Sequence, residues 1–273
     1  MICFCHMIKT AGTTLHYIFR NNYGFGYAEI NKPSFNQRDL RVLKFAGGGG
    51  GVKAIGGHGL RPDDGLRAVA NDIFFLTFIR NPVARFISHY NHGLKAGSHD
   101  DSLEKRCSIV GEHDYQTKFL LGCKSLEERS FAAGAAELER AKKILQTEFQ
   151  FVGVVERFNE SLLLMRHALG LPNFEIRYQP KNVKPDSAAK TLSLSEKDDA
   201  AVRQANQIDI QLYHFAEQEI FNRHRAQYGT SRLLNEAESL DKACQTYRFS
   251  TLNNIAFRVG KYLFYRPFLK FFG

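Results

Sequence analysis

The sequence predicts an α/β domain in which a mostly parallel central sheet is flanked by helices in three layers. Three short apolar runs have the length and composition of buried strands: residues 2–7 (ICFCHM), 72–79 (DIFFLTFI) and 151–155 (FVGVV). Segments of helical periodicity separate them, and strands that alternate with helices are typical of a parallel sheet. The chain has 273 residues, which is long enough for one large domain of this kind.

The helices that follow the first two strands carry their own start and stop signals. Apolar residues repeat at helical spacing in residues 13–24, and a glycine stands where this helix is expected to end. After the second strand, Asn81 is placed to cap a helix that Pro82 opens. The apolar positions expected on one face of that helix are Val83, Phe86, Ile87, Tyr90 and Leu94.

Two regions between these elements are predicted to be irregular. Residues 31–51 are rich in loop-forming residues and end in five consecutive glycines, which favour no single backbone conformation. Residues 53–62 follow as a brief strand that runs into a turn. A polar loop is predicted again at residues 178–190.

The rest of the chain is predicted to be mainly helical. The section from about 101 to 148 has a mostly helical pattern, and the helix after the third strand ends with Gly170 as its C-cap. Residues 193–229 have the pattern of one long helix, in which Ser193 and Glu196 form a capping box.

Charge and composition limit the classes of partner. The formal net charge is +9, which favours an anionic partner such as a nucleotide, a nucleic acid, an acidic polysaccharide or a membrane surface. Five scattered cysteines without a CxxC pair argue against a disulfide framework or a zinc site. Because the chain has no leader-like segment and no apolar run long enough to span a bilayer, we expect a cytoplasmic protein of the soluble bacterial type.

The opening segment HMIKTAGTTLH, residues 6–16, has the components of a phosphate-binding loop. It lies where the first strand meets the first helix, and a helix N-terminus presents unpaired N–H groups that bind anions. The residues that form the loop are Lys9, Thr10, Ala11, Gly12, Thr13 and Thr14. The lysine stands first, whereas in a Walker A loop it stands near the end. As an isolated pattern, the segment is equally consistent with an ordinary capped helix start.

A second anion site is predicted at the end of the second strand. Arg80 follows that strand directly, and open α/β sheets bind ligands at the carboxyl ends of their strands. Ser88 lies on the next helix and adds a hydroxyl near the same crevice. Two neighbouring anion sites would suit a ligand with two separate phosphate groups. The alternative is a structural ion pair at Arg80 and a surface hydroxyl at Ser88.

These two motifs together resemble those of the PAPS-dependent sulfotransferases. HMIKTAGTTLH resembles the 5′-phosphosulfate-binding motif, and FLTFIRNPVARFISHY resembles the 3′-phosphate-binding motif. Three further stretches agree in order, namely GGHG, YQTKFLLG and FVGVVERFNESLLLMRHALGLP. The resemblance covers residues 3 to about 225, and it is nearest to the carbohydrate sulfotransferases of the heparan sulfate 2-O-sulfotransferase type. It implies a P-loop-like fold.

The resemblance also implies a reaction and a set of roles. The co-substrate is 3′-phosphoadenosine 5′-phosphosulfate (PAPS), the product is PAP, and no metal is required. Arg80 and Ser88 would bind the 3′-phosphate, residues 10–14 would hold the 5′-phosphate, and Lys9 would stabilise the leaving PAP. The acceptor is expected to be a hydroxyl, most simply that of a sugar. His58 is the predicted general base, because histidine titrates near neutral pH and the matching family histidine lies between the same two motifs.

Several less specific matches complete the expectations for the site. Gln116 and Lys118 either line the acceptor cleft or are solvated residues of a helix. Glu156 and Arg157 are predicted to form an ion pair near the cofactor, and the loop around residues 181–184 to fold over PAP.

Two other functional classes stay open, and one structural division is expected. The chain could instead be a P-loop-type kinase or a non-catalytic module that binds acidic glycans; no nucleic-acid-binding motif is present. Residues 1–228 are expected to form the sulfotransferase domain. Residues 229–273 are expected to be a basic, aromatic extension that packs on it, with peripheral contact to a membrane surface as the alternative.

Overall fold

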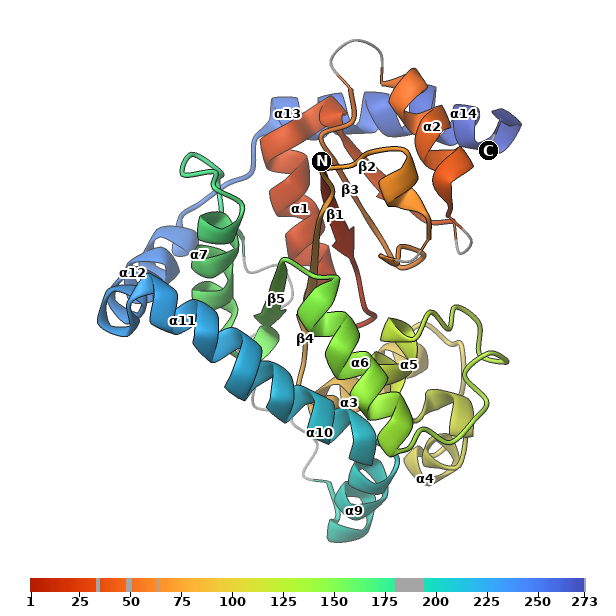
Figure 1. The fold of residues 1–273 in the computed structure, drawn as a ribbon. Coiled ribbons are helices and arrows are strands. Elements are labelled where there is room, and N and C mark those ends of the chain that lie inside the picture. The colour runs from red at the N-terminus through yellow and green to blue at the C-terminus, as the bar shows by residue number, and fades with distance from the viewer. Residues whose placement is uncertain (33–34, 48–50, 63, 180–193, 273) are drawn as a thin grey trace.

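The protein is an α/β fold built on a five-stranded, all-parallel sheet, as the sequence predicts (Figure 1). The computed structural model describes residues 1–32, 35–47, 51–62, 64–179 and 194–272. The strands occur in the order β2-β3-β1-β4-β5. Their bounds are β1 Ile2–Cys5, β2 Tyr27–Ile30, β3 Ala54–Gly57, β4 Phe74–Ile79 and β5 Phe151–Val154.

The strand order places the sites predicted from the sequence together at the carboxyl ends of neighbouring strands. β1 is central, with Cys3 paired to Ile55 of β3 on one side and to Phe75 of β4 on the other. From β3 the chain crosses over β1 to reach β4, so the carboxyl ends of β1 and β4 meet where the direction of winding changes. Ligand-binding crevices of open parallel sheets form at such a switch point.

Helices cover both faces of the sheet in three layers. Figure 1 shows α1 and α7 on one side and α2 and α6 on the other. The longer helices are α1 Gly12–Tyr23, α2 Gln37–Ala46, α3 Pro82–Lys95, α6 Ala135–Thr147, α7 Phe158–Ala168, α9 Glu196–Gln204, α10 Gln207–Phe215, α12 Thr230–Gln245 and α13 Thr251–Val259. The shorter ones are α4 Leu103–Cys107, α5 Tyr115–Leu120, α11 Asn222–Tyr228 and α14 Arg266–Phe272, with π-helical turns at η6 Ala216–Phe221 and η7 Gly260–Tyr265. Single 3₁₀ turns occur at η1 Gly24–Gly26, η3 Leu66–Ala68, η4 Val110–Glu112 and η5 Val155–Arg157.

Phenylalanine side chains join the central strands to one another. The ring of Phe4 on β1 lies edge-on to Phe78 on β4, with centroids 6.5 Å apart, and Phe78 contacts Phe151 on β5 at 5.9 Å. Phe19 of α1 stacks on Phe4 at 6.0 Å. All four rings are fully buried, so much of the large phenylalanine content serves the core.

The region 31–51 is more regular than the sequence suggests. α2 occupies residues 37–46, because Asn36 and Asp39 form a reciprocal capping box that starts a helix there. The strand β2, immediately before this region, has no equivalent among the sequence predictions. Its four residues are stabilised by pairing with β3 rather than by a clear local pattern. The middle three glycines of the run, residues 48–50, lie outside the described residues.

Two predicted helices begin or continue differently from expectation. In the section predicted as mostly helical, residues 121–134 form no α-helix, and α6 begins at Ala135 after Gly134. The long helix expected over 193–229 is interrupted at residues 205–206, because the Asp114 carboxylate accepts hydrogen bonds from the backbone at the start of α10. Its predicted cap at Ser193 lies outside the described residues. Ser195 caps α9 instead.

The buried face of α3 also differs from the predicted apolar stripe. Arg85 and Phe86 are buried, whereas Leu94 is exposed. The helix therefore turns an arginine, rather than only apolar side chains, toward the protein interior. The expected N-cap is confirmed, since the Asn81 side chain accepts a hydrogen bond from the Ala84 N–H at 3.1 Å.

The C-terminal helices run across the β2 edge of the molecule. α13 packs on α1, η7 contacts β2 and α14 packs on α2 (Figure 1). The Lys261 ammonium of η7 and the Arg20 guanidinium of α1 both pair with the Glu29 carboxylate of β2. Across the described residues, no helix combines the length and the apolarity needed to cross a bilayer. The predicted contact of this tail with a membrane surface, and its boundary at residue 229, stay predictions.

Candidate active site

The loop between β1 and α1 has a strained backbone. Lys9 and Ala11 both adopt positive φ angles, 69° and 60°, which non-glycine residues rarely do. The hydroxyl of Thr10 donates a hydrogen bond to the Met7 carbonyl at 3.0 Å, and the Thr10 side chain is fully buried. This hydroxyl therefore closes the loop. Backbone strain of this kind is commonly found where a loop is shaped for a ligand.

The loop ends at a helix N-terminus that can hold an anion. The first backbone hydrogen bond of α1 runs from the Leu15 N–H to the Ala11 carbonyl at 3.3 Å. Within the described part of the chain, the N–H groups of residues 12–14 have no hydrogen-bond partner. Three unpaired donors at the positive end of a helix dipole can hold an anion, and the phosphate-binding role of this loop stays a prediction.

Arg80 lies beside this loop, as predicted. It follows β4 directly, and its Nη1 donates a hydrogen bond to the Lys9 carbonyl at 3.1 Å. The Gln116 side chain holds the Arg80 backbone from both sides, accepting from its N–H at 2.9 Å and donating to its carbonyl at 2.8 Å. The two sequence motifs, 71 residues apart, therefore lie in contact at the carboxyl ends of β1 and β4.

These strand ends carry positive charge that no carboxylate neutralises by direct contact. Neither Lys9 nor Arg80 belongs to an ion pair among the described residues. Arg85 is buried nearby with its guanidinium over the Tyr115 ring, and its Nε and Nη2 have no hydrogen-bond partner there. Burial and the neighbouring charge of Arg80 lower the pKa of Lys9 from its usual 10.5. An anion with more than one charge would stabilise such a cluster.

Ser88 lies on α3 and is half-buried. The described contacts include no hydrogen bond to its hydroxyl, so this group is available to a ligand. Its predicted role in binding a 3′-phosphate stays a prediction.

His58 follows β3, on the opposite side of β1 from Arg80. Its Nδ1 is hydrogen-bonded to the His6 carbonyl at 2.8 Å. Because a carbonyl oxygen only accepts, Nδ1 carries the proton and the Nε2 of neutral His58 has a free lone pair. Burial lowers the pKa of His58 from 6.5, while the hydrogen bond to His6 acts in the opposite direction. A neutral imidazole with a free nitrogen is the form that a general base requires.

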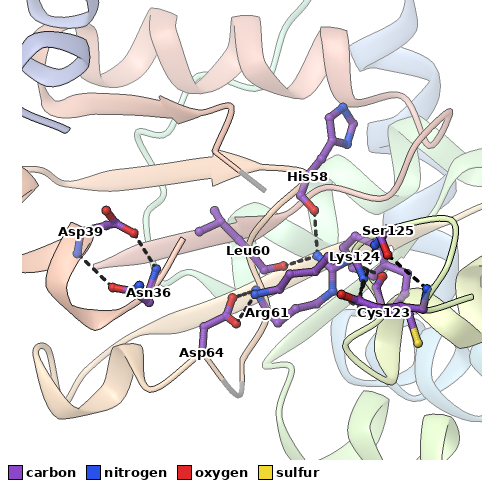
Figure 2. A network of polar contacts seen from close by, with 11 residues as sticks. Asn36, Asp39, His58, Leu60, Arg61, Asp64, Cys123, Lys124 and Ser125 are labelled. Carbon is purple, nitrogen blue, oxygen red and sulfur yellow. Dashed lines mark hydrogen bonds and ion pairs between the residues drawn. The ribbon is translucent and has the colours of Figure 1, made fainter. Parts of the chain in front are cut away.

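Arg61 holds the backbone of His58, a role that the sequence analysis missed. The guanidinium donates to the carbonyls of His58 at 2.7 Å and Phe119 at 2.7 Å, and it lies over the Phe119 ring. Figure 2 shows the His58 carbonyl pointing into this network and its ring pointing away from it. Lys124 pairs with Asp64 at 2.7 Å and joins the same two segments. A single arginine gives little sequence signal, because its partners are backbone carbonyls.

The less specific predictions are resolved one by one. Gln116 and Lys118 are both fully buried, so neither is a solvated helix residue, and Lys118 donates to the Val110 carbonyl. The predicted Glu156–Arg157 pair does not form. Arg157 pairs with other glutamates, whereas Glu156 accepts from the Asn81 N–H at 2.9 Å and so supports the end of β4. The loop at residues 181–184 lies outside the described residues.

Residues 119–260, just over half of the chain, match the galactose-3-O-sulfotransferase family. The chain belongs to this family. No curated protein matches the chain. The membership confirms the carbohydrate sulfotransferase class, although the family is not the heparan sulfate 2-O-sulfotransferase type suggested by the motifs.

The galactose-3-O-sulfotransferase family carries out sulfuryl transfer from PAPS to a sugar hydroxyl, so the protein is a PAPS-dependent sulfotransferase. This favours the sulfotransferase interpretation over the kinase and the non-catalytic module. The matched residues begin at 119, so they contain Phe119, which accepts a hydrogen bond from Arg61, but not Lys9, His58, Arg80 or Ser88. The roles of these four residues therefore depend on the geometry and on the motifs.

Proposed function

We propose that the residues at the carboxyl ends of β1, β3 and β4 catalyse transfer of the sulfuryl group of PAPS to the 3-hydroxyl of a galactose-type sugar. The family description supports the acceptor. The contact between the Arg80 guanidinium and the Lys9 carbonyl is the observation that carries the site, because it joins two anion-binding motifs at adjacent strand ends.

PAPS fits the donors that the structure brings together. The unpaired N–H groups at the start of α1, with Lys9 beside them, would hold the 5′-phosphosulfate. Arg80 and Ser88, at the end of β4 and on α3, would hold the 3′-phosphate. Two phosphate sites at neighbouring strand ends favour a 3′,5′-bisphosphate over ATP.

The proposed reaction is an in-line displacement at sulfur. The Nε2 of His58 accepts the proton of the sugar hydroxyl, and the oxygen forms a bond to the sulfur of PAPS. The bond from sulfur to the bridging oxygen breaks at the same time, and PAP leaves with the electron pair. The Lys9 ammonium stabilises the negative charge that grows on that oxygen. The chain thus contributes mainly by positioning and electrostatic stabilisation, as in phosphoryl transfer.

Binding and transfer assays test this function separately. Calorimetry should show that PAP binds without added magnesium and that ADP binds poorly. A labelled-sulfate assay over galactosides, other sugars and phenols should show transfer to a galactoside. His58→Ala should lower kcat by about 10²–10⁴ and leave PAP affinity nearly unchanged, since a general base acts only in the reaction.

Matched variants make the test specific. Lys9→Ala should lower kcat strongly, and Lys143→Ala, on the exposed face of α6, should not. His92→Ala, at an exposed position of α3, is the control for His58. The proposal is wrong if ADP binds more tightly than PAP. The assigned mechanism is wrong if Lys9→Ala and His58→Ala both retain full turnover.

A further inference from the structure

Three buried side chains, His6, His16 and Tyr27, form a hydrogen-bonded network next to the proposed PAPS loop. The mechanism above does not use this network. Nδ1 of His6 is hydrogen-bonded to Nε2 of His16 at 3.1 Å, and Nδ1 of His16 is hydrogen-bonded to the Tyr27 hydroxyl. His6 follows β1, His16 lies on α1 and Tyr27 begins β2. All three side chains are buried. Such a network has a high energetic cost if any member is left unpaired.

Donor and acceptor counting gives this network a single direction. The Tyr27 hydroxyl is fully buried, and His16 is its hydrogen-bond partner in the described residues, so the hydroxyl proton is donated to Nδ1 of His16. A neutral His16 then has its proton on Nε2 and donates it to Nδ1 of His6. A neutral His6 must in turn have its proton on Nε2.

Burial keeps both histidines neutral, which the counting requires. It lowers the pKa of His16 to about 3 and lowers the pKa of His6 well below its usual 6.5. The charges of Lys9 and His58 act in the same direction on His6. At neutral pH each ring therefore has one N–H donor and one lone pair.

The free Nε2 of His6 faces the start of α1. A Cβ placed on Gly12 would lie 1.6 Å from this atom, so the ring lies directly against the first residue of the helix. Nε2 has no hydrogen-bond partner in the described structure, yet it is not sealed from solvent. The ring packs against Phe4, with centroids 5.2 Å apart, and against His58, with centroids 4.0 Å apart. Its orientation is therefore fixed before a ligand arrives.

We propose that His6 is a further cofactor-binding residue, whose Nε2–H donates a hydrogen bond to the 5′-phosphosulfate held at the N-terminus of α1. His16 and Tyr27 are positioning residues that fix the tautomer of His6. This inference rests on the proposed function. It assigns different roles to two neighbouring imidazoles, since His6 presents a donor to the cofactor and His58 presents a lone pair to the acceptor hydroxyl.

The tautomers can be measured without any ligand. Long-range ¹H–¹⁵N correlation spectra of histidine-labelled protein at neutral pH should show His6 and His16 as Nε2–H tautomers and His58 as an Nδ1–H tautomer. Tyr27→Phe removes the donor that sets the direction and should convert His6 to a mixture of tautomers. Tyr23→Phe, at a position packed on Phe174, is the matched control and should leave the spectra unchanged. An Nδ1–H tautomer of His6 in the wild-type protein would overturn the proposal.

Binding of PAP, measured by calorimetry, tests the contact itself. His6→Asn keeps a polar atom near Nδ1 but removes the Nε2–H, and it should weaken PAP binding by about 10- to 100-fold, as expected for a lost hydrogen bond to a charged group. His6→Gln, whose amide reaches the position of Nε2, should recover part of this loss. If the wild-type protein does not bind PAP, the proposed function fails. If it binds PAP and His6→Asn binds it equally well, only the role of His6 fails.

Discussion

Gly12→Ala is predicted to lower the free energy of unfolding and to weaken PAP binding, because the added Cβ would collide with the His6 ring. An added Cβ would lie 1.6 Å from Nε2 and 1.9 Å from Cε1 of His6, whereas ordinary contacts begin near 3.4 Å. The ring would have to move by roughly 2 Å, a shift that exceeds what a close-packed interior absorbs without strain. The packing of the ring against Phe4 and His58 opposes that movement, and so does its hydrogen bond to His16.

The cost can be worked out from the contacts that must change. Breaking the His6–His16 hydrogen bond leaves a buried nitrogen unpaired, which costs about 1–3 kcal/mol. Overpacking adds about 1–3 kcal/mol. The better helix propensity of alanine returns at most about 1 kcal/mol. The free energy of unfolding should therefore fall by about 1–6 kcal/mol, and PAP binding should be largely lost.

Urea denaturation of a double-mutant cycle measures this effect. In the His6→Ala background the obstacle is absent, so adding Gly12→Ala should cost less than about 0.5 kcal/mol. Gly134→Ala, where a Cβ would meet nothing closer than 3.6 Å, is the control and should cost less than about 1 kcal/mol. The reasoning is refuted if Gly12→Ala is as stable as the wild-type protein, or if its cost is the same with and without the His6 ring.

Three further predictions concern the pH dependence and the support of the site. His16 has a folded-state pKa of about 3 and an unfolded value near 6.5, so its neutral form stabilises the fold above pH 6.5 and this contribution is lost as the pH falls toward 3. Urea denaturation should show a loss of about 1.4 kcal/mol from this residue between pH 7.5 and 5.5, and His16→Asn should reduce that slope. Because the pKa of His58 is lowered, the acid limb of the kcat profile should lie below pH 6.5; a limb above 6.5 would contradict its assignment. Arg61→Lys cannot reproduce the forked contacts to the His58 and Phe119 carbonyls, so kcat should fall at least tenfold with PAP affinity nearly unchanged, and an unchanged kcat would refute this positioning role.

The sequence could predict elements whose signals are local. The buried strands at residues 2–7, 72–79 and 151–155 carry unbroken apolar runs, and all three are confirmed with shorter ends. The Asn81 cap is likewise a signal within a few residues. The prediction of irregular structure over 31–51 was wrong because the capping box at Asn36 was not recognised, although that signal is present in the sequence.

The sequence could not predict features that depend on distant backbone groups. The break in the helix near residue 205 is made by Asp114, and no local residue marks it. Arg61 acts on carbonyls of segments far along the chain, and carbonyl positions leave no trace in residue identity. The burial of Arg85, which differs from the apolar stripe predicted for α3, depends on packing against the Tyr115 ring of another element.

By itself, the sequence determined the class of the fold and the position of the loop that meets the start of α1. It also singled out Lys9, His58 and Arg80 as candidate site residues. These follow from residue type and short-range order, which control backbone conformation and charge. Only the tertiary structure decided that β1 lies between β3 and β4, so that the three residues lie at neighbouring strand ends. It also brought Tyr27, His16 and His6 together in one hydrogen-bonded network. Strand order and contacts between distant side chains depend on which surfaces pack together, and that choice is made by the whole core.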